Sequence, residues 1–286
     1  MSIRLAFRES HSLRRALWAL LLLLSTSPSL AFESIAGDPI FDRFNISVGT
    51  FFYTSGTQVT LNGAFGTRGV PVDLENQLGF KDVNRFRIDG YWRITTHQRL
   101  RFLYFDASRH SSKTISDTIH YGDTTFPIGA TVSAKNKVTV GELAYEYDFF
   151  VRKNWSLGAS LGIHNIDFGL RLSANTTTPT TSQTQSLNQN ASADGPLPMI
   201  GLAGIWRPES WLYFTLGAQA LKVTVNPYSG TLQDYSVSAV WQPTKHFGVG
   251  AGYDYFRMNT SVSKLSFNGD LGWRYSGARV FVSGSF

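Results

Sequence analysis

Residues 85–94 read RFRIDGYWRI and alternate without exception between two kinds of side chain. One face carries Phe86, Ile88, Gly90, Trp92 and Ile94, and the other carries Arg85, Arg87, Asp89, Tyr91 and Arg93. Successive side chains of a β-strand point to opposite faces of the sheet, so a period of two predicts a strand. This strand would have one apolar face and one strongly charged face.

The same alternation returns along the rest of the chain. It is found at residues 43–53, 142–149, 155–164, 234–242 and 247–255, and no helical period competes with it after residue 31. We therefore expect an all-β protein made of antiparallel two-faced strands.

Four short polar stretches separate these strands, at residues 95–98, 152–154, 208–210 and 243–246. Aromatic side chains flank every one of them. Amphipathic rings gathered at one depth form the aromatic girdle of a membrane interface, so we expect the four turns to lie at one interface. The predicted girdle consists of Trp92, Phe149, Trp155, Trp206, Trp211, Trp241 and Phe247.

The composition agrees with a surface that faces lipid. Charged residues make up 16% of the 286 residues, below the roughly 25% that is usual for soluble proteins. The mean hydropathy of −0.11 and the lack of any run of 18 apolar residues exclude a helical membrane bundle. The chain has no cysteine, which excludes disulfides, thiolate nucleophiles and cysteine-ligated metal sites.

The first 31 residues have the pattern of a cleavable secretory signal. Four arginines precede the apolar stretch ALWALLLLL at residues 16–24, and Ser29-Leu30-Ala31 supplies the small residues that a signal peptidase requires. Nine apolar residues span only about 14 Å of helix, too short for a membrane anchor. We expect cleavage after Ala31 and export by the general secretory route, with residues 32–286 forming a single barrel domain.

Part of the positive charge belongs to that signal. Residues 1–31 contribute four arginines against Glu9, a net +3 of the chain's +6, and leave about +3 for residues 32–286. No block of lysine and arginine is present in the remainder, so we exclude nucleic acid as a partner.

The connections at the other end are longer, at residues 54–84, 110–136 and 173–196. Four short turns join eight strands, and the first and last strands add two, so we predict a transmembrane, antiparallel up-and-down barrel of ten strands; eight and twelve stay open. Residues 173–196 are rich in Ser, Thr, Asn and Gln, with Asp194 as their only charge, and predict a surface loop. Residues 72–80 mix apolar and acidic side chains, and we expect them to anchor a loop or cover the barrel mouth.

The end of the chain supplies a resemblance. In residues 277–286, GARVFVSGSF, the side chains of Ala278, Val280 and Val282 alternate toward Phe286. This pattern resembles the terminal strand that the barrel-assembly machinery of Gram-negative bacteria reads, and implies that machinery as a folding partner. The whole chain resembles the small outer-membrane barrels of the OmpA and OmpW types. The resemblance implies the outer membrane as location, with membrane lipid and lipopolysaccharide as neighbours.

Inward charges are concentrated on three consecutive strands, whereas later strands point mainly Gly and Ser inward. Long arginines can reach over those small residues, so we predict a network of arginine–carboxylate pairs that fills the lumen. This favours a structural or surface-interaction role over the alternative of a narrow channel for small, anionic solutes. The predicted network consists of Arg85, Arg87, Asp89, Arg93, Arg99, Arg101, Glu142, Glu146 and Asp148.

A weaker alternative is a surface enzyme. His110 and Ser112 stand two apart, a spacing similar to the His-x-Ser of outer-membrane lipid A deacylases, although Lys113 replaces the usual Asn. Acidic and histidine residues at the rim are also similar to those of omptin-type proteases, which have ten strands; here these are Asp117, His120 and Asp123. We expect no enzymatic activity, no cofactor and no metal site, since His97, His164 and His246 are scattered along the sequence.

Overall fold

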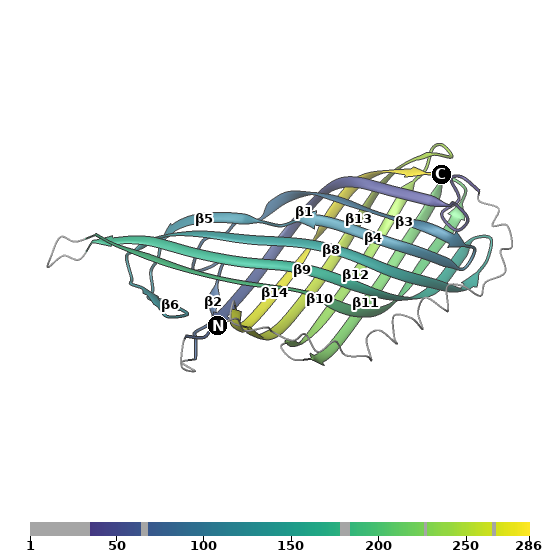
Figure 1. Ribbon diagram of the computed structural model, residues 1–286. Coiled ribbons are helices and arrows are strands. Elements are labelled where there is room, and N and C mark those ends of the chain that lie inside the picture. Colours follow the sequence, from purple (N-terminus) through teal and green to yellow (C-terminus); the bar gives the residue numbers. More distant parts are fainter. Residues whose placement is uncertain (1–34, 64–67, 178–183, 226–227, 265–266) are drawn as a thin grey trace, which may run out of the picture. The chain divides into compact units, whose positions relative to one another are not determined.

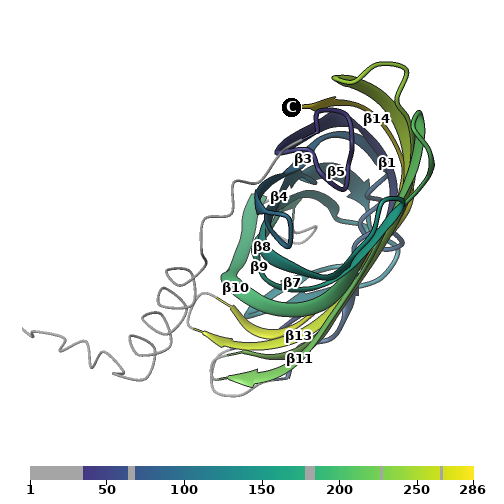
Figure 2. The ribbon, with the colours of Figure 1, turned by 90° about the vertical axis from the view of Figure 1, so that its right-hand side faces the viewer.

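Ten antiparallel strands form a closed ring in the computed structural model, which describes residues 35–63, 68–177, 184–225, 228–264 and 267–286 (Figure 1). Each strand pairs with the next, and the last pairs with the first, so the ring has no open edge (Figure 2). The prediction of ten strands is confirmed. In order these strands are β1 (Phe44–Leu61), β3 (Val83–Thr95), β4 (Gln98–Asp106), β8 (Thr131–Val151), β9 (Trp155–Thr177), β10 (Thr184–Glu209), β11 (Leu212–Val225), β12 (Tyr228–Trp241), β13 (Phe247–Lys264) and β14 (Phe267–Ser285).

Four shorter strands complete the fold. β5 (Arg109–Thr114) continues the course of β4 and pairs with the same neighbour, β8. β2 (Val72–Asp73) pairs with β1, and β6 (Ile119–Tyr121) and β7 (Thr124–Phe126) form a separate hairpin. No helix in the described ranges is long and apolar enough to cross a membrane.

The four short turns lie where the sequence predicts them. They join β3 to β4, β8 to β9, β10 to β11 and β12 to β13, and the start of β1 and the end of β14 lie at the same end of the ring. We call this the turn end, and the opposite end the long-strand end. The predicted signal, residues 1–31, lies outside the described residues.

Side chains alternate across the ring wall as the period of two requires. Phe86 and Leu143 are exposed on the outer surface, whereas Arg87 and Glu142, one position away in each strand, are buried in the lumen. The wall therefore has an apolar outside and a charged inside near the turn end.

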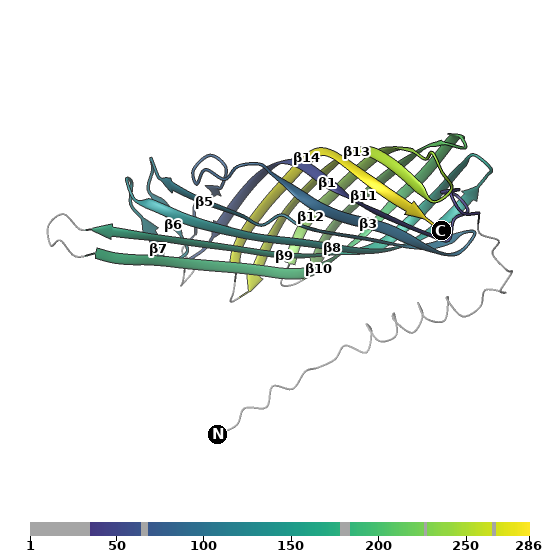
Figure 3. The same ribbon diagram turned by 90° about the horizontal axis from the view of Figure 1, so that it is seen from above.

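Three strands continue well beyond the others at the long-strand end (Figures 1 and 3). β8, β9 and β10 have 21, 23 and 26 residues, against 14 each for β11 and β12. In this extension the inner face is apolar and the outer face is polar. Val132, Ala134 and Val138 are buried on the inner face, and Lys135 and Lys137 are exposed on the outer face. Because an outer face of lysines suits water and not lipid, the extension stands outside the apolar part of a membrane.

The prediction of a surface loop at residues 173–196 is wrong. β9 and β10 pair through most of this segment, with Ser173 opposite Asn188 and Leu170 opposite Ala191. Polar residues take the outer face, and small apolar residues such as Ala191 and Ala193 are buried on the inner face. The alternation is present, but its weakly apolar members give little signal in the sequence.

Candidate functional site: the lumen and its two closures

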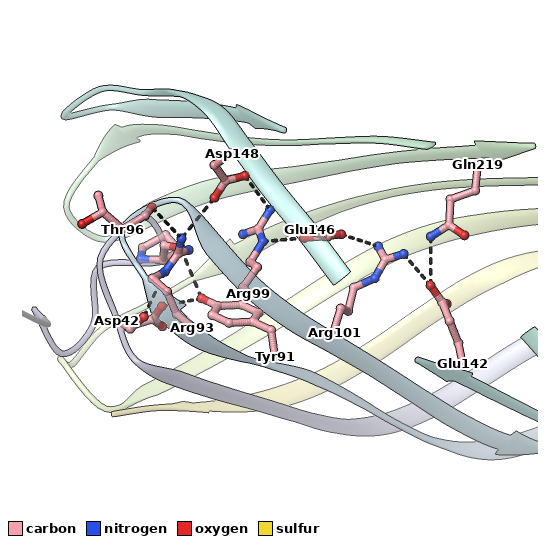
Figure 4. A network of polar contacts seen from close by, with 11 residues as sticks. Asp42, Tyr91, Arg93, Thr96, Arg99, Arg101, Glu142, Glu146, Asp148 and Gln219 are labelled. Atoms are coloured by element: carbon pink, nitrogen blue, oxygen red, sulfur yellow. Dashed lines mark hydrogen bonds and ion pairs between the residues drawn. The ribbon is translucent and has the colours of Figure 1, made fainter. Parts of the chain in front are cut away.

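A ladder of arginines and carboxylates runs along the lumen wall between β3, β4 and β8 (Figure 4). Arg93 Nη1 lies 3.1 Å from Asp148, and Arg99 bridges Asp148 and Glu146. Arg101 then lies 3.4 Å from Glu146 and 2.6 Å from Glu142, and Gln219 of β11 donates to Glu142 from across the lumen at 2.9 Å. Each carboxylate is thus shared by two donor side chains.

Strand register explains this ladder. Arg93 and Arg99 face each other directly across β3 and β4, an arrangement that like charges disfavour. Asp148 accepts a hydrogen bond from Arg93 and lies 3.5 Å from Arg99, so it compensates both charges. Arg93 and Asp148 are fully buried, and removing one partner of such a pair typically costs about 3–5 kcal/mol because the other charge is left uncompensated.

A second group of four charges closes the opposite side of the same lumen. Arg87 contacts Asp89 at 3.1 Å and Asp254 at 3.3 Å, and Arg279 contacts the same two carboxylates at 3.2 and 3.1 Å. These side chains come from β3, β13 and β14, so the group crosses the seam where the ring closes. Two guanidinium groups and two carboxylates compensate one another's charge in this group.

Small residues on the later strands make room for the arginines. A Cβ atom at Gly252 of β13 would lie only 2.9 Å from Nε of Arg279, and one at Gly217 of β11 would be in van der Waals contact with the guanidinium of Arg101. Between the two groups of charges lies a polar cavity of about 130 Å³, which Ser236 and Ser238 also line. Side chains therefore fill much of the lumen near the turn end, and this cavity lies among them.

The structure brings together eight of the nine residues predicted for the network. Arg85 is the exception, since its guanidinium donates to the backbone carbonyl of Ser108 instead of a carboxylate. The sequence reading missed Gln219, Asp254 and Arg279 as members. Asp254 and Arg279 do alternate inward with their strands, but the sequence shows mainly glycine and serine at the other inward positions of these strands.

The turn end is closed by the segment that precedes β1. Ile40 is fully buried there, and Asp38 pairs with Arg207 of β10. Arg93 donates to the backbone carbonyl of Pro39 at 3.0 Å, so the charge ladder also holds this segment in place.

Asp42 of this segment is buried and accepts a 2.5 Å hydrogen bond from the hydroxyl of Tyr91. Burial disfavours the charged carboxylate, and this raises the pKa of Asp42 to about 7, although Tyr91 and Arg93 act in the opposite direction.

An aromatic core closes the lumen toward the long-strand end. Phe51, Phe105 and Tyr275 contact one another edge to face, with ring centroids 5.6 to 5.9 Å apart. Phe256 stacks on Tyr275 at 4.9 Å. All four rings are buried, and such rings leave no aqueous path between them.

The connection between β1 and β3 packs into this core. Leu74 and Leu78 are fully buried, and Glu75 forms an ion pair with Arg109 at 2.8 Å and accepts from the backbone N–H of Thr57 at 2.6 Å. The sequence predicts that residues 72–80 anchor a loop or cover the barrel mouth. In the structure they pack inside the barrel mouth.

The rim residues considered for catalysis are not gathered into one site. On β5, His110 and Ser112 lie on the same exposed face, and Lys135 and Ser133 of β8 stand opposite them. Ser111 lies on the other face and donates to the carbonyl of Leu78. His120 contacts Thr125, and Asp117 accepts from Ser116. No base, nucleophile and orienting acid meet among these described residues.

The predicted girdle residues all lie on the outer surface near the turn end. Their exposed fractions range from 41% for Trp155 to 55% for Trp206. Phe286 is also exposed, and its backbone exchanges hydrogen bonds with Phe44 at 2.8 and 2.9 Å, which fastens the end of the seam between β14 and β1.

The closed ten-strand ring allows a comparison with known structures. The outer-membrane protease OmpT of Escherichia coli aligns with a TM-score of 0.57 and 10% identity, over 86% of this chain and 97% of OmpT. The fold is that of the Gram-negative outer-membrane β-barrels. At this identity the likeness concerns the fold alone.

Two further outer-membrane structures align less well. The toluene transporter TodX of Pseudomonas putida gives a TM-score of 0.34 at 9% identity, over 91% of this chain and 93% of TodX. The attachment invasion locus protein Ail of Yersinia pestis gives 0.28 at 12% identity, over 84% and 98%. Scores this low support no argument. No protein-family model matches the chain, and no curated protein matches its sequence significantly.

Proposed function

We propose that this barrel resides in the outer membrane, exported by the signal at residues 1–31, as a non-conducting protein whose long-strand end takes part in surface interactions. The observation that carries the proposal is the double closure of the lumen. Charge pairs and the segment before β1 fill the turn end, and the aromatic core fills the other. A narrow channel would need a continuous polar path, and the buried rings of Phe51, Phe105 and Tyr275 interrupt it.

Planar-bilayer recording of the refolded protein tests this proposal. We expect no conductance steps from the wild type under conditions in which an open porin conducts. Arg87→Ala and Arg101→Ala should also give no conductance steps, because the aromatic core still closes the lumen toward the long-strand end. Reproducible steps whose ion selectivity changes in either variant would show that the lumen conducts and would overturn the proposal.

The scattered rim residues support a protein without enzymatic activity. His110 and Ser112 both lie on the exposed face of β5, and their partners across β8 are Lys135 and Ser133, so neither partner is a carboxylate that could orient the histidine. Cleavage of lipid A or of a peptide by the refolded protein, abolished in His110→Ala, would contradict this part of the proposal.

We also propose lipopolysaccharide as a partner of the extension. Lys135 lies directly opposite His110 of β5 on one side and Arg171 of β9 on the other, and all three are exposed on the outer face. This basic row stands beyond the apolar surface that ends near Leu143 and Ile163. Anionic phosphates of a lipid headgroup would meet the row at that height.

Binding of purified lipopolysaccharide to the detergent-solubilised protein tests the basic row. Each cation near a charged membrane surface contributes about 1 kcal/mol, so we expect Lys135→Ala/Arg171→Ala to weaken binding about tenfold or more, and added salt to reduce the difference. The matched control is Arg152→Ala/Lys153→Ala, which removes two exposed cations at the turn end. Equal losses in both double variants would contradict a specific site.

A further inference from the structure

A histidine and two carboxylates from three strands meet at one point of the lumen. Nε2 of His164, on β9, lies 3.4 Å from Oε2 of Glu142 on β8 and 3.5 Å from Oδ2 of Asp234 on β12. The three atoms all lie within 4.8 Å of one another, the only such group found in the described part of the chain. These residues are far apart in sequence, so no motif with a fixed spacing predicts the group.

The charge balance around this group differs from the rest of the lumen. Glu142, Glu146, Asp148, Asp89 and Asp254 each have an arginine within ion-pair distance. Within the described residues, Asp234 pairs only with His164. One negative charge of the lumen is therefore left without a guanidinium group.

Glu142 divides its two oxygens between different partners. Oε1 accepts from Arg101 and Gln219, and Oε2 faces His164. The oxygen that faces the histidine can therefore bind a further cation while the charge ladder stays intact.

The neighbouring glutamine supplies a second, independent observation. Gln219 is only 5% exposed, and its Oε1 is buried without a hydrogen-bond partner. Its amide nitrogen donates to Glu142, so the unpaired oxygen belongs to a side chain that contacts the group and lines the same cavity. The polar cavity of about 130 Å³ is lined by Gln219, Glu142 and Asp234, which gives room for water molecules that a bound ion would keep.

We propose that Glu142, His164 and Asp234 bind a divalent transition-metal ion, with Zn²⁺ as the best fit. With metal–ligand bonds of about 2.0–2.2 Å, two ligands of a tetrahedral ion lie about 3.3–3.6 Å apart, which matches the two distances from His164. One imidazole with two carboxylates suits Zn²⁺ or Co²⁺ better than Ca²⁺ or Mg²⁺, which prefer oxygen ligands alone. Asp234 lines the cavity and can move closer to Glu142 to complete the site.

The ion would act as a brace across the barrel. Glu142 and His164 belong to adjacent strands, whereas β12 is separated from β9 by β10 and β11. Binding would tie these two parts of the wall together, and an ion that binds only the folded barrel raises its stability.

Titration with Co²⁺ tests the site directly, because a tetrahedral Co²⁺ centre absorbs visible light. The protein is refolded in detergent with a chelator, freed of it, and titrated; in a second series Co²⁺ is present during refolding. We expect saturable binding of one ion, displaced by Zn²⁺, and at least tenfold weaker binding in both His164→Gln and Asp234→Asn. His120→Gln removes an exposed histidine of β6 and should bind like the wild type.

Thermal unfolding gives a readout that surface binding would not produce. Zn²⁺ should raise the temperature at which the folded band disappears from a detergent gel in the wild type, and should have no effect in Asp234→Asn. Asp234 is half-buried, so this variant tests the site even where His164→Gln fails to fold. Absence of saturable Co²⁺ binding in both series, or equal affinity in the wild type and both variants, would overturn the proposal. Neither result depends on whether the barrel conducts.

Discussion

Asp42 links the closure of the turn end to pH. Its carboxyl is buried, accepts from Tyr91, and has a second oxygen that is buried without a partner. Burial raises the pKa of Asp42 to about 7, against about 3.9 in an unfolded chain. Between these two values the folded protein keeps a proton that the unfolded chain has lost.

Asp42 should stabilise the folded barrel at low pH and not at neutral pH. The folded state binds more protons than the unfolded state in this range, so the contribution of Asp42 to stability is full below about pH 4 and is lost as the pH rises to about 7. Three pKa units correspond to a change on the order of 4 kcal/mol. We expect Asp42→Asn to remove this slope, since an amide does not titrate.

Urea unfolding of the barrel in lipid vesicles measures this effect between pH 4 and pH 8. The difference in free energy of unfolding between wild type and Asp42→Asn isolates Asp42, because the other titrating groups contribute equally to both proteins. A difference that stays constant across the range would show that Asp42 titrates normally in the folded barrel.

Single residues also show how far the sequence could predict the lumen. The period of two puts Arg87, Arg101 and Glu142 on the inner face, and the structure places them there. It does not tell which carboxylate meets which arginine across the ring. Arg279 and Asp89 are 190 positions apart, and their contact depends on the stagger and curvature of ten strands.

At the level of elements, β8 shows that alternation predicts a strand without predicting its surroundings. Even-numbered residues point inward from Val132 to Asp148, but they are apolar up to Val140 except for Asn136, and charged from Glu142 except for Ala144. The apolar side chains of β8 thus change from the inner face to the outer face without a break in the strand. The inversion marks the place where the outer face stops meeting lipid and begins to meet water.

The same inversion explains why the sequence of the β9–β10 hairpin predicts a loop at residues 173–196. A strand in water with a narrow inner face needs only small apolar residues on one side, such as Ala174, Ala191 and Ala193. Strand prediction depends on strong contrast between the two faces, and serine or asparagine beside alanine gives little. In the membrane part of β9, at residues 155–164, leucine stands against glycine and serine, and there the contrast does predict the strand.

The whole molecule combines two kinds of interior inside one wall. The half near the turn end is held by buried ion pairs, and the half near the long-strand end is a packed apolar core like that of a soluble protein. The first kind of interior depends on satisfied charges, and the second on shape and volume. The two halves should therefore respond differently to the loss of one large side chain.

Two phenylalanines of the same barrel allow a matched comparison. Phe256 is fully buried in the aromatic core and stacks on Tyr275, whereas Phe86 points outward with 62% of its surface exposed. Phe256→Ala should lower the free energy of unfolding by about 3–5 kcal/mol, because it leaves a cavity that packed neighbours cannot fill. Phe86→Ala should lower the free energy of unfolding by only about 1.5–3 kcal/mol, because it removes the gain from transferring the ring into lipid but leaves no cavity.

Urea unfolding in vesicles measures both losses, and bilayer recording of the same variants measures any leak. We expect Phe256→Ala to stay non-conducting, since Phe51, Phe105 and Tyr275 still block the path and an apolar cavity stays dry. Equal losses in the two variants would mean that the rings near the long-strand end are loosely packed. The core would then be a movable plug, and the closure on which the proposed function depends would have to rest on the charge network alone.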